Sequence, residues 1–264
     1  MSSRFEDFVA LIARLRAPGG CPWDREQTHE SLKPMTVEEA YEVVEAIDHG
    51  DEELAGELGD LLLQVVFHAQ IATDEGRFTI ADVIDRVSDK MVRRHPHVFG
   101  DHEADTADAV LRKWEALKAE ELRAKGKPPE AGSMLDGVSK SLPAVMEAFQ
   151  MTTKVGRVGF DWPHAASVLA KLDEEAEELR RAASTPAPDH HAVQDEIGDL
   201  LFVAVNLARK LGVDPESALK ATNRKFRRRF RHVEERLRES GREPASSTLE
   251  EMDALWNEAK TKGL

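Results

Sequence analysis

Apolar residues recur along this chain at the three- and four-residue spacing of an α-helix. Phe5, Phe8 and Ile12, for example, stand at this spacing with charged residues between them. Helices of this kind bury one stripe of their surface against their neighbours and leave the rest in water. The pattern predicts an all-α protein, and no segment shows a convincing strand pattern.

Turn residues and proline divide the pattern into segments. The run Asp48-His49-Gly50-Asp51 separates two helices of a hairpin, and Pro96 ends the next helix because proline disfavours helix at the residue before it. The predicted helices cover residues 5–15, 36–48, 53–73, 79–94, 106–125, 142–155, 165–183, 190–211, 215–240 and 247–261.

The two halves of the chain repeat one another. Residues 57–69 (ELGDLLLQVVFHA) align with residues 196–208 (EIGDLLFVAVNLA). Each half carries a tryptophan segment, two acidic helices and then a helix with a Lys-x-x-x-Arg pair. This order predicts two homologous tandem helical-bundle domains, at 1–125 and 141–264, with a linker at 126–140 that contains a Gly-Lys-Pro-Pro run.

Composition narrows the possible functions. The 264 residues carry a formal net charge of −14, which disfavours binding to nucleic acid polymers or to an anionic membrane surface. No apolar run approaches the ~20 residues that span a bilayer. Cys21 is the one cysteine, so no disulfide can form within the chain. Without a signal sequence at the start, these features lead us to expect a cytoplasmic protein.

The acidic residues of the repeat are the first candidates for chemistry. Carboxylates three positions apart share one helix face, so the acids of two antiparallel helices would surround one point. A hard divalent cation relieves their repulsion, and Mg²⁺ is the usual one beside phosphates. A solvated helix face is the alternative for any single glutamate, but the recurrence argues against it. The predicted metal ligands are Glu39, Glu42, Glu57 and Asp60 in the first half, and Glu175, Glu178, Glu196 and Asp199 in the second.

Four further residues belong to the same helices. Glu38 and Glu174 stand one residue before the predicted ligands and are candidates to orient a water molecule or to hold a second ion. Gly59 and Gly198 lie inside helices, where glycine costs about 1 kcal/mol relative to alanine. We therefore expect another helix or a ligand to approach closely at these glycines.

Basic and aromatic residues could complete a nucleotide site. Lysine supplies a point charge and arginine a planar fork that matches phosphate oxygens, so each Lys/Arg pair could clamp a phosphate. Ordinary surface charge is the alternative. The tryptophans could stack on a nucleobase, although a tryptophan in a loop more often anchors packing. The candidates are Lys225, Arg229 and Asn223 in the second half, Lys90 and Arg94 in the first, and Trp23 and Trp162 in the loops.

Taken in order, these motifs resemble the MazG family of all-α nucleoside triphosphate pyrophosphohydrolases along nearly the full chain. The resemblance rests on Gly20-Cys21-Pro22-Trp23-Asp24, Gln27-Thr28, the acidic motifs, the run Arg93-Arg94-His95-Pro96-His97-Val98-Phe99, the run Val158-Gly159-Phe160-Asp161-Trp162, and Lys225-Phe226-x-x-Arg229-Phe230. It implies two tandem helical domains and a homodimer. It also implies hydrolysis of ribo- and deoxynucleoside triphosphates to monophosphate and pyrophosphate with Mg²⁺, which Mn²⁺ could replace.

The resemblance also suggests a mechanism. Some relatives act mainly through the C-terminal domain, so we expect the acids of the second half to form the main active site, with Glu174 and Glu175 as catalytic carboxylates. Glu38 would have the same role in the first half. Water activated by the metal would attack the α-phosphorus, while Lys225 and Arg229 neutralise the leaving phosphates. No protein nucleophile is needed.

Three other functions are alternatives to this one. A di-iron carboxylate bundle requires Glu-x-x-His pairs, and neither half has a suitably placed histidine. A helical protein that binds nucleotides in order to sense them would keep the same residues without turnover. A pyrophosphatase with a single substrate would share the acidic motif, but the full-length resemblance to the tandem-domain family argues against it.

Overall fold

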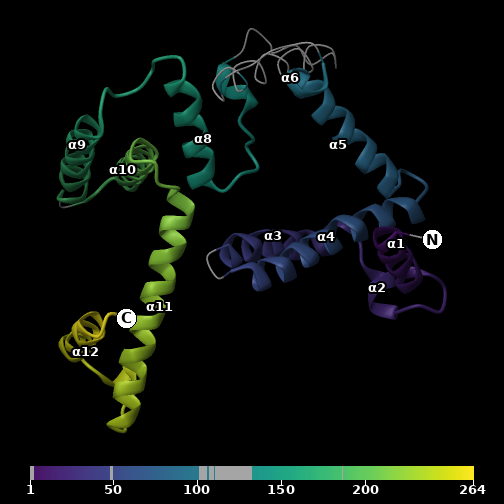
Figure 1. Ribbon diagram of the computed structural model, residues 1–264. Coiled ribbons are helices and arrows are strands. Elements are labelled where there is room, and N and C mark those ends of the chain that lie inside the picture. Colours follow the sequence, from purple (N-terminus) through teal and green to yellow (C-terminus); the bar gives the residue numbers. More distant parts are fainter. Residues whose placement is uncertain (1–2, 48–49, 101–105, 107–109, 111–132, 186) are drawn as a thin grey trace. The chain divides into compact units, whose positions relative to one another are not determined.

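The computed structural model consists of helices (Figure 1). It describes residues 3–47, 50–100, 106, 110, 133–185 and 187–264. No strand occurs in these ranges, so the all-α prediction is confirmed. None of the helices described there is both long and apolar enough to cross a membrane.

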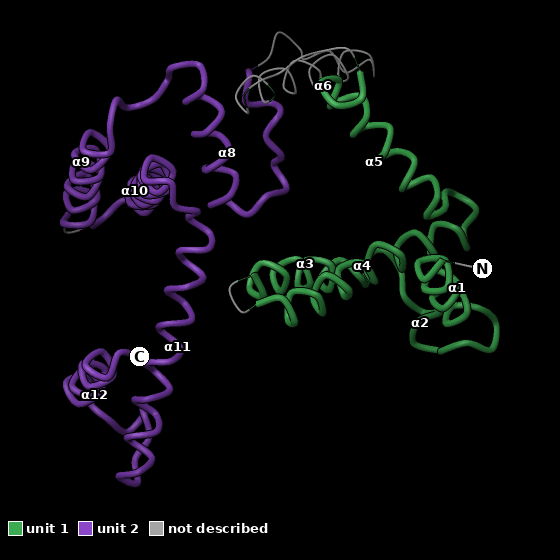
Figure 2. Tube along the Cα trace, in the orientation of Figure 1, with its two compact units in different colours: residues 1–128 green, residues 129–264 purple. Residues whose placement is uncertain are grey.

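The chain separates into two compact units, Met1–Pro128 and Pro129–Leu264 (Figure 2). Most of the helix predicted at 106–125, and the first part of the linker predicted at 126–140, lie outside the described residues. The predicted domain boundaries therefore stay a prediction.

The first unit is built on a hairpin of two long helices, α3 and α4. Its helices are α1 (Arg4–Arg16), α2 (Pro22–Glu26), α3 (His29–Ala46), α4 (Asp51–Asp74), α5 (Ile80–Arg94) and α6 (Pro96–Phe99). The helix α1 packs against α4, and α5 follows α4 after a turn. The buried core lies where α1, α3 and α4 meet and consists of Ile12, Leu32, Val66, Phe67 and Ile71.

The start of α3 differs from the prediction. Thr28 Oγ1 accepts a hydrogen bond from the Ser31 amide at 3.2 Å, and Ser31 Oγ accepts one from the Thr28 amide at 3.0 Å. This capping box starts the helix at His29 rather than at residue 36. Pro34 is the sixth residue of α3 and lies past its first turn, so the helix continues there without one of its backbone hydrogen bonds.

The second unit repeats this arrangement and extends it. Its helices are α8 (Ala144–Gly156), α9 (Ala165–Ala183), α10 (His190–Lys210), α11 (Pro215–Glu239) and α12 (Leu249–Thr261), with short 3₁₀ turns η1 (Met134–Gly137) and η2 (Pro244–Ser246). As in the first unit, α9 and α10 form a hairpin, and α8 packs on α10 as α1 packs on α4. The long helix α11 leaves this group and packs against α12 (Figure 1).

Ion pairs tie the N-terminal segments of each unit to the second hairpin helix. In the first unit the Arg16 guanidinium of α1 donates to Asp74 of α4 at 2.8 Å. In the second unit Asp161, in the loop between α8 and α9, accepts from Arg209 at 2.6 Å and from Lys210 at 2.9 Å. The carboxylate lies on the hairpin helix in one unit and on the loop in the other, so the two halves reach a similar connection with the charges exchanged.

Candidate functional site

Three of the four predicted ligands meet between α3 and α4. Glu39, Glu42 and Glu57 place carboxylate oxygens within 4.8 Å of one another. Asp60 lies outside this trio but is close enough for its charge to act on Glu39 and Glu57. Glu38 is exposed on α3. We call these three glutamates, with Asp60, the first cluster.

The second unit forms an equivalent group from a different subset of acids. Glu175, Glu196 and Asp199 place carboxylate oxygens within 4.8 Å of one another, and with Glu178 they form the second cluster. Glu178 is drawn aside because Arg181, one turn later on α9, donates to it at 3.2 Å. Its charge nevertheless acts on Glu196.

Burial and mutual repulsion disfavour the charged form of these groups. Partial burial, and then neighbouring carboxylates led by Glu42, raise the pKa of both Glu39 and Glu57. Partial burial, and then the charge of Glu178, raise the pKa of Glu196. Such shifts are typical of carboxylates gathered for function, and a bound cation would reverse them.

A lysine lies within the second cluster. Lys171 Nζ is 2.7 Å from Glu175, whose side chain is buried, and 3.0 Å from Glu174. Hydrogen bonds to Glu175 and then Glu174 raise the pKa of Lys171. Aligning Glu39 with Glu175 places Met35 opposite Lys171, and Met35 packs against the hydrophobic core. The sequence analysis missed this lysine, although its position one turn before Glu175 on the same helix face was a usable signal.

The glycines of the acidic helices do not have the role expected within the chain. No described heavy atom lies within 4 Å of the position that a Cβ would take at Gly59 or Gly198. The expected close approach of another helix is therefore wrong for the described part of this chain. The space beside each glycine is open to a ligand or to another molecule.

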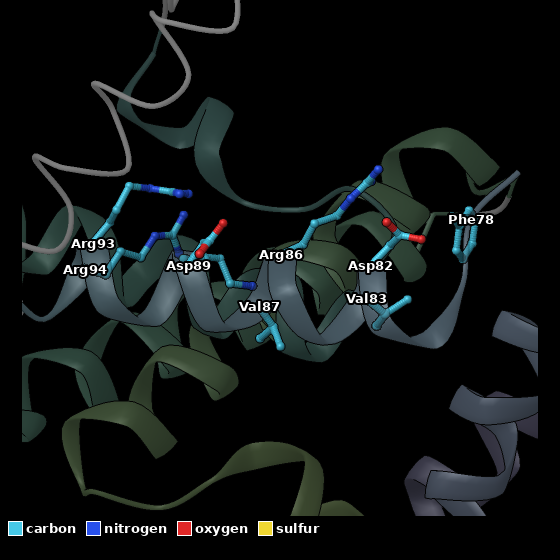
Figure 3. A pocket seen from close by; sticks show the side chains of 9 residues that line it. Phe78, Asp82, Val83, Arg86, Val87, Asp89, Arg93 and Arg94 are labelled. Atoms are coloured by element: carbon cyan, nitrogen blue, oxygen red, sulfur yellow. The ribbon is translucent and has the colours of Figure 1, made fainter. Parts of the chain in front are cut away.

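The predicted basic clamps lie on other helices. In the first unit Lys90 and Arg94 line a hollow along α5 that Phe78 and Asp89 also border (Figure 3). In the second unit the pair lies on α11, where Lys225 and Asn223 are exposed.

Arg229 is engaged by the C-terminal segment. Its Nε donates to the Leu264 carbonyl at 2.7 Å, and its guanidinium carbon lies 5.7 Å from the centre of the Trp256 ring. Among the described residues, the structure gives Arg229 no hydrogen bond or ion pair with the second cluster. Trp256 was not singled out from the sequence, because a tryptophan on an amphipathic helix is indistinguishable from a packing residue.

The two predicted aromatic contacts differ in exposure. Trp23 on α2 has 53% of its surface exposed and is free to meet a ligand. Trp162 is half-buried and follows Asp161, so the ion pairs to α10 hold its loop in place. Whether either ring contacts a nucleotide stays a prediction.

Comparison with known proteins agrees with this geometry. The family model of the MazG nucleotide pyrophosphohydrolase domain matches residues 27–99 and 164–234, so each match contains one cluster and one Lys/Arg pair. The Thermotoga maritima protein named nucleoside triphosphate pyrophosphohydrolase/pyrophosphatase MazG is 45% identical over 97% of this chain and 95% of its own length. The Escherichia coli (strain K12) protein named nucleoside triphosphate pyrophosphohydrolase is 44% identical over 98% and 97%.

A third relative is longer than this chain. The Bacillus subtilis protein named uncharacterized protein YabN is 49% identical over 97% of this chain but only 51% of its own length. The double match of the family model confirms the tandem repeat, and the similarity over nearly the full chain confirms the resemblance. This chain belongs to the MazG nucleotide pyrophosphohydrolase domain family.

Proposed function

We propose that this chain is a Mg²⁺-dependent nucleoside triphosphate pyrophosphohydrolase. It would convert ribo- and deoxynucleoside triphosphates of several bases to the monophosphate and pyrophosphate. The observation that carries the proposal is the pair of carboxylate clusters, each inside a segment that matches the pyrophosphohydrolase domain. Relatives named for this activity align over nearly the whole chain, which supports the same assignment.

Both clusters suit a hard divalent cation. Their donors are oxygens, and the pKa values of Glu39, Glu57 and Glu196 are raised by burial and then by neighbouring carboxylates, whose repulsion a cation would relieve. When bound, Mg²⁺ would offset the charge of the triphosphate and make a nearby water more acidic; Mn²⁺ could replace it. The ligands would be Glu39, Glu42, Glu57 and Asp60 in the first unit, and Glu175, Glu178, Glu196 and Asp199 in the second.

Other residues of the chain would bind the substrate and accept the proton of the attacking water. Glu174 and Glu38 lie beside the ligands and could accept a proton from the attacking water. Lys171 would be released when a cation takes over Glu175, leaving its ammonium group beside the cluster to meet phosphate oxygens. Lys225 and Arg229 would neutralise the leaving pyrophosphate once α11 lies beside the cluster.

The remaining predicted contacts would recognise the nucleotide. These candidates are Trp162, Asn223, Trp23, Lys90 and Arg94. The working form would be a homodimer in the cytoplasm. Exposed apolar residues on α5, among them Ile84, Val87 and Met91, support dimer formation.

The test is hydrolysis in ¹⁸O-labelled water with Mg²⁺ and a panel of nucleoside triphosphates. Attack at the α-phosphorus would place the label in the monophosphate and leave pyrophosphate unlabelled. Labelled pyrophosphate would mean attack at the β-phosphorus, and inorganic phosphate with a diphosphate would mean that another bond is cut. Turnover of a single nucleotide would favour the narrow pyrophosphatase, and binding without turnover would favour a nucleotide sensor.

Variants of each cluster would assign the activity to a unit. Glu196→Ala should lower turnover by the second unit at least about 100-fold, since it removes a direct metal ligand. Glu57→Ala should do the same for the first unit. Comparing each variant with the double variant shows which cluster contributes. Unchanged turnover in the double variant would contradict the assignment of both clusters.

A further inference from the structure

Side chains from α3, α4 and the turn before α5 form a continuous chain of hydrogen bonds in the first unit. His29 of α3 and His68 of α4 lie nearly parallel, with their Nδ1 atoms 2.8 Å apart. Arg77 Nη2 lies 2.5 Å from His29 Nε2 at one end. At the other end His68 Nε2 lies 3.1 Å from Thr36 Oγ1, which donates to the Leu32 carbonyl at 3.0 Å.

The two ends of this hydrogen-bond chain, Arg77 and Thr36, fix the direction of every hydrogen bond in it. A guanidinium can only donate, so His29 Nε2 must accept and the proton of that ring lies on Nδ1. His68 Nδ1 then accepts this proton, which places the proton of His68 on Nε2. His68 donates to Thr36, whose own hydroxyl proton goes to the Leu32 carbonyl. This single consistent assignment requires both rings to be neutral, with His29 and His68 in opposite tautomers.

An added proton cannot be accommodated. If His68 is doubly protonated, its Nδ1 becomes a donor, so His29 must accept there and carry its proton on Nε2. That proton then faces the guanidinium of Arg77, donor against donor. If His29 is doubly protonated, the same conflict with Arg77 arises directly. One extra proton on either ring therefore detaches Arg77, which lies in the turn that leads into α5.

The chain also lies in line with the first cluster. Thr36 precedes Glu39 by one turn of α3, and His68 follows Glu57 by 11 residues, about three turns, on the same side of α4. The hydrogen bonds between Thr36, His68 and His29 thus join α3 to α4 along the face whose other end carries the carboxylates.

We propose that His29 and His68 are positioning residues of the first cluster, which hold α3, α4 and the turn before α5 together only while both rings are neutral. The inference rests on the proposed function in one respect, that the first cluster binds a divalent cation. The consequence is that mild acid loosens the first cluster by a route separate from protonation of its carboxylates.

The surroundings of the pair agree with neutral rings. Burial, and then the charge of His29, lower the pKa of His68. Arg77 has Glu75 as its charged partner. Two further ion pairs lie on the elements packed around the pair: Arg16 of α1 with Asp74 of α4, and Lys33 with Glu30 of α3.

The second unit provides an internal comparison. Aligning Glu39 with Glu175 places Ala165 opposite His29 and Leu172 opposite Thr36, and aligning Glu57 with Glu196 places Leu207 opposite His68. The register is supported by Leu32 and its counterpart Val168, which are both fully buried. The second unit thus builds its hairpin with apolar side chains at these positions, and the hydrogen-bond chain belongs to the first unit.

The tautomers can be read directly from the nitrogen chemical shifts of the histidine rings in the ¹⁵N-labelled full chain. At pH 8 we expect His29 protonated on Nδ1 and His68 on Nε2. Both tautomers should be lost together as the pH falls, since one proton breaks the whole chain. A His29 ring protonated on Nε2 at pH 8, or two rings that titrate independently, would overturn the proposal.

The effect on the first cluster is measured by Mn²⁺ binding to the full chain carrying Glu175→Gln and Glu196→Gln, which disables the second cluster. In this background His68→Leu, the residue found in the second unit, should weaken Mn²⁺ binding about 10-fold at pH 8. The ratio of the two affinities should approach one at pH 5.5, because the hydrogen bonds between Arg77, His29, His68 and Thr36 are broken in both proteins. Protonation of the carboxylates affects both proteins alike and cancels in the ratio.

Further variants separate a specific effect from damage to the fold. Thr36→Val keeps the side-chain shape, removes the acceptor for His68, and should weaken binding in the same direction. His164→Leu alters a histidine of the second unit that bonds Ser167, and it should leave the ratio at one. A ratio independent of pH would refute the inference. Absence of Mn²⁺ binding at pH 8 in the parent protein would refute the proposed metal site, while the tautomers still decide the hydrogen-bond chain.

Discussion

In the absence of bound metal, we expect the charged carboxylate of Glu57 to lower the stability of the folded protein. Its pKa is raised by burial and by neighbouring carboxylates, so the folded chain binds this proton more tightly than the unfolded chain does. Stability must then fall as the pH rises from the ordinary pKa of a glutamate through the raised one, and above that window the full penalty remains. Glu57→Gln should therefore raise the unfolding midpoint in EDTA at pH 8, as measured by thermal denaturation.

The same variant should respond less to metal. If the clusters bind Mg²⁺ as proposed, added Mg²⁺ should stabilise the native protein, and Glu57→Gln should lose the first cluster's share of that gain. Glu235→Gln, which alters an exposed glutamate of α11 outside both clusters, is the matched control and should change neither midpoint. A lower midpoint for Glu57→Gln in EDTA would show that the carboxylates do not repel one another.

Asp161 secures the loop that carries Trp162. Its carboxylate accepts from Arg209 and Lys210, and these hydrogen bonds outweigh the effect of burial, so the pKa of Asp161 is held below its ordinary value. Asp161→Asn would leave two cations, each less than one-fifth exposed, without their charged partner. We expect a loss of about 2–3 kcal/mol in the free energy of unfolding, measured by urea denaturation.

The pH dependence of this variant provides the check. Because the pKa of Asp161 is lowered in the folded state, its stabilisation is present above the ordinary aspartate pKa and is lost as the pH falls through the lowered value. The wild-type chain and Asp161→Asn should therefore differ most near neutral pH and converge in acid. An equal difference at every pH would mean that the ion pairs are not the source of the stability.

Single residues also show what the sequence could not predict. The acids were found because helical spacing alone places them on one face. Which three of four would meet depended on Arg181, which draws Glu178 away in the second unit. The hydrogen bond between His29 and His68 could not be predicted, because the two residues are 39 positions apart in the sequence and meet only when α3 packs against α4.

At the scale of elements, periodicity predicted the long helices of the described chain to within a few residues, except for the start of α3. Local pattern sufficed because each of these helices has one apolar stripe and a turn or proline at its ends. The short helices α2 and α6 were missed, since four or five residues hold too little pattern to detect. The predicted start of α3 was seven residues too late, because the helix begins at the Thr28 cap and continues through Pro34.

Across the whole molecule, the two repeats carry similar carboxylate clusters but place different side chains beside them. The second cluster contains its own cation, Lys171, whereas the aligned Met35 belongs to the core of the first unit. The first unit instead carries the chain of neutral histidines beside its cluster. If both clusters bind metal as proposed, the two sites should therefore differ in metal affinity and in pH response.

The apolar stripe of α5 points to the assembled state. Ile84, Val87 and Met91 recur at helical spacing and are each more than one-third exposed, so water contacts a surface that would be stabilised by burial. If a second copy covers this stripe, light scattering should give twice the 29.4 kDa of one chain. Val87→Asp should then shift the protein towards monomer, because it would bury an unpaired carboxylate. Arg86→Asp introduces the same carboxylate at the adjacent position, whose side chain points in a different direction (Figure 3), and it should leave the dimer intact. A monomeric wild-type chain, or equal dissociation by both variants, would show that this stripe is not the dimer interface.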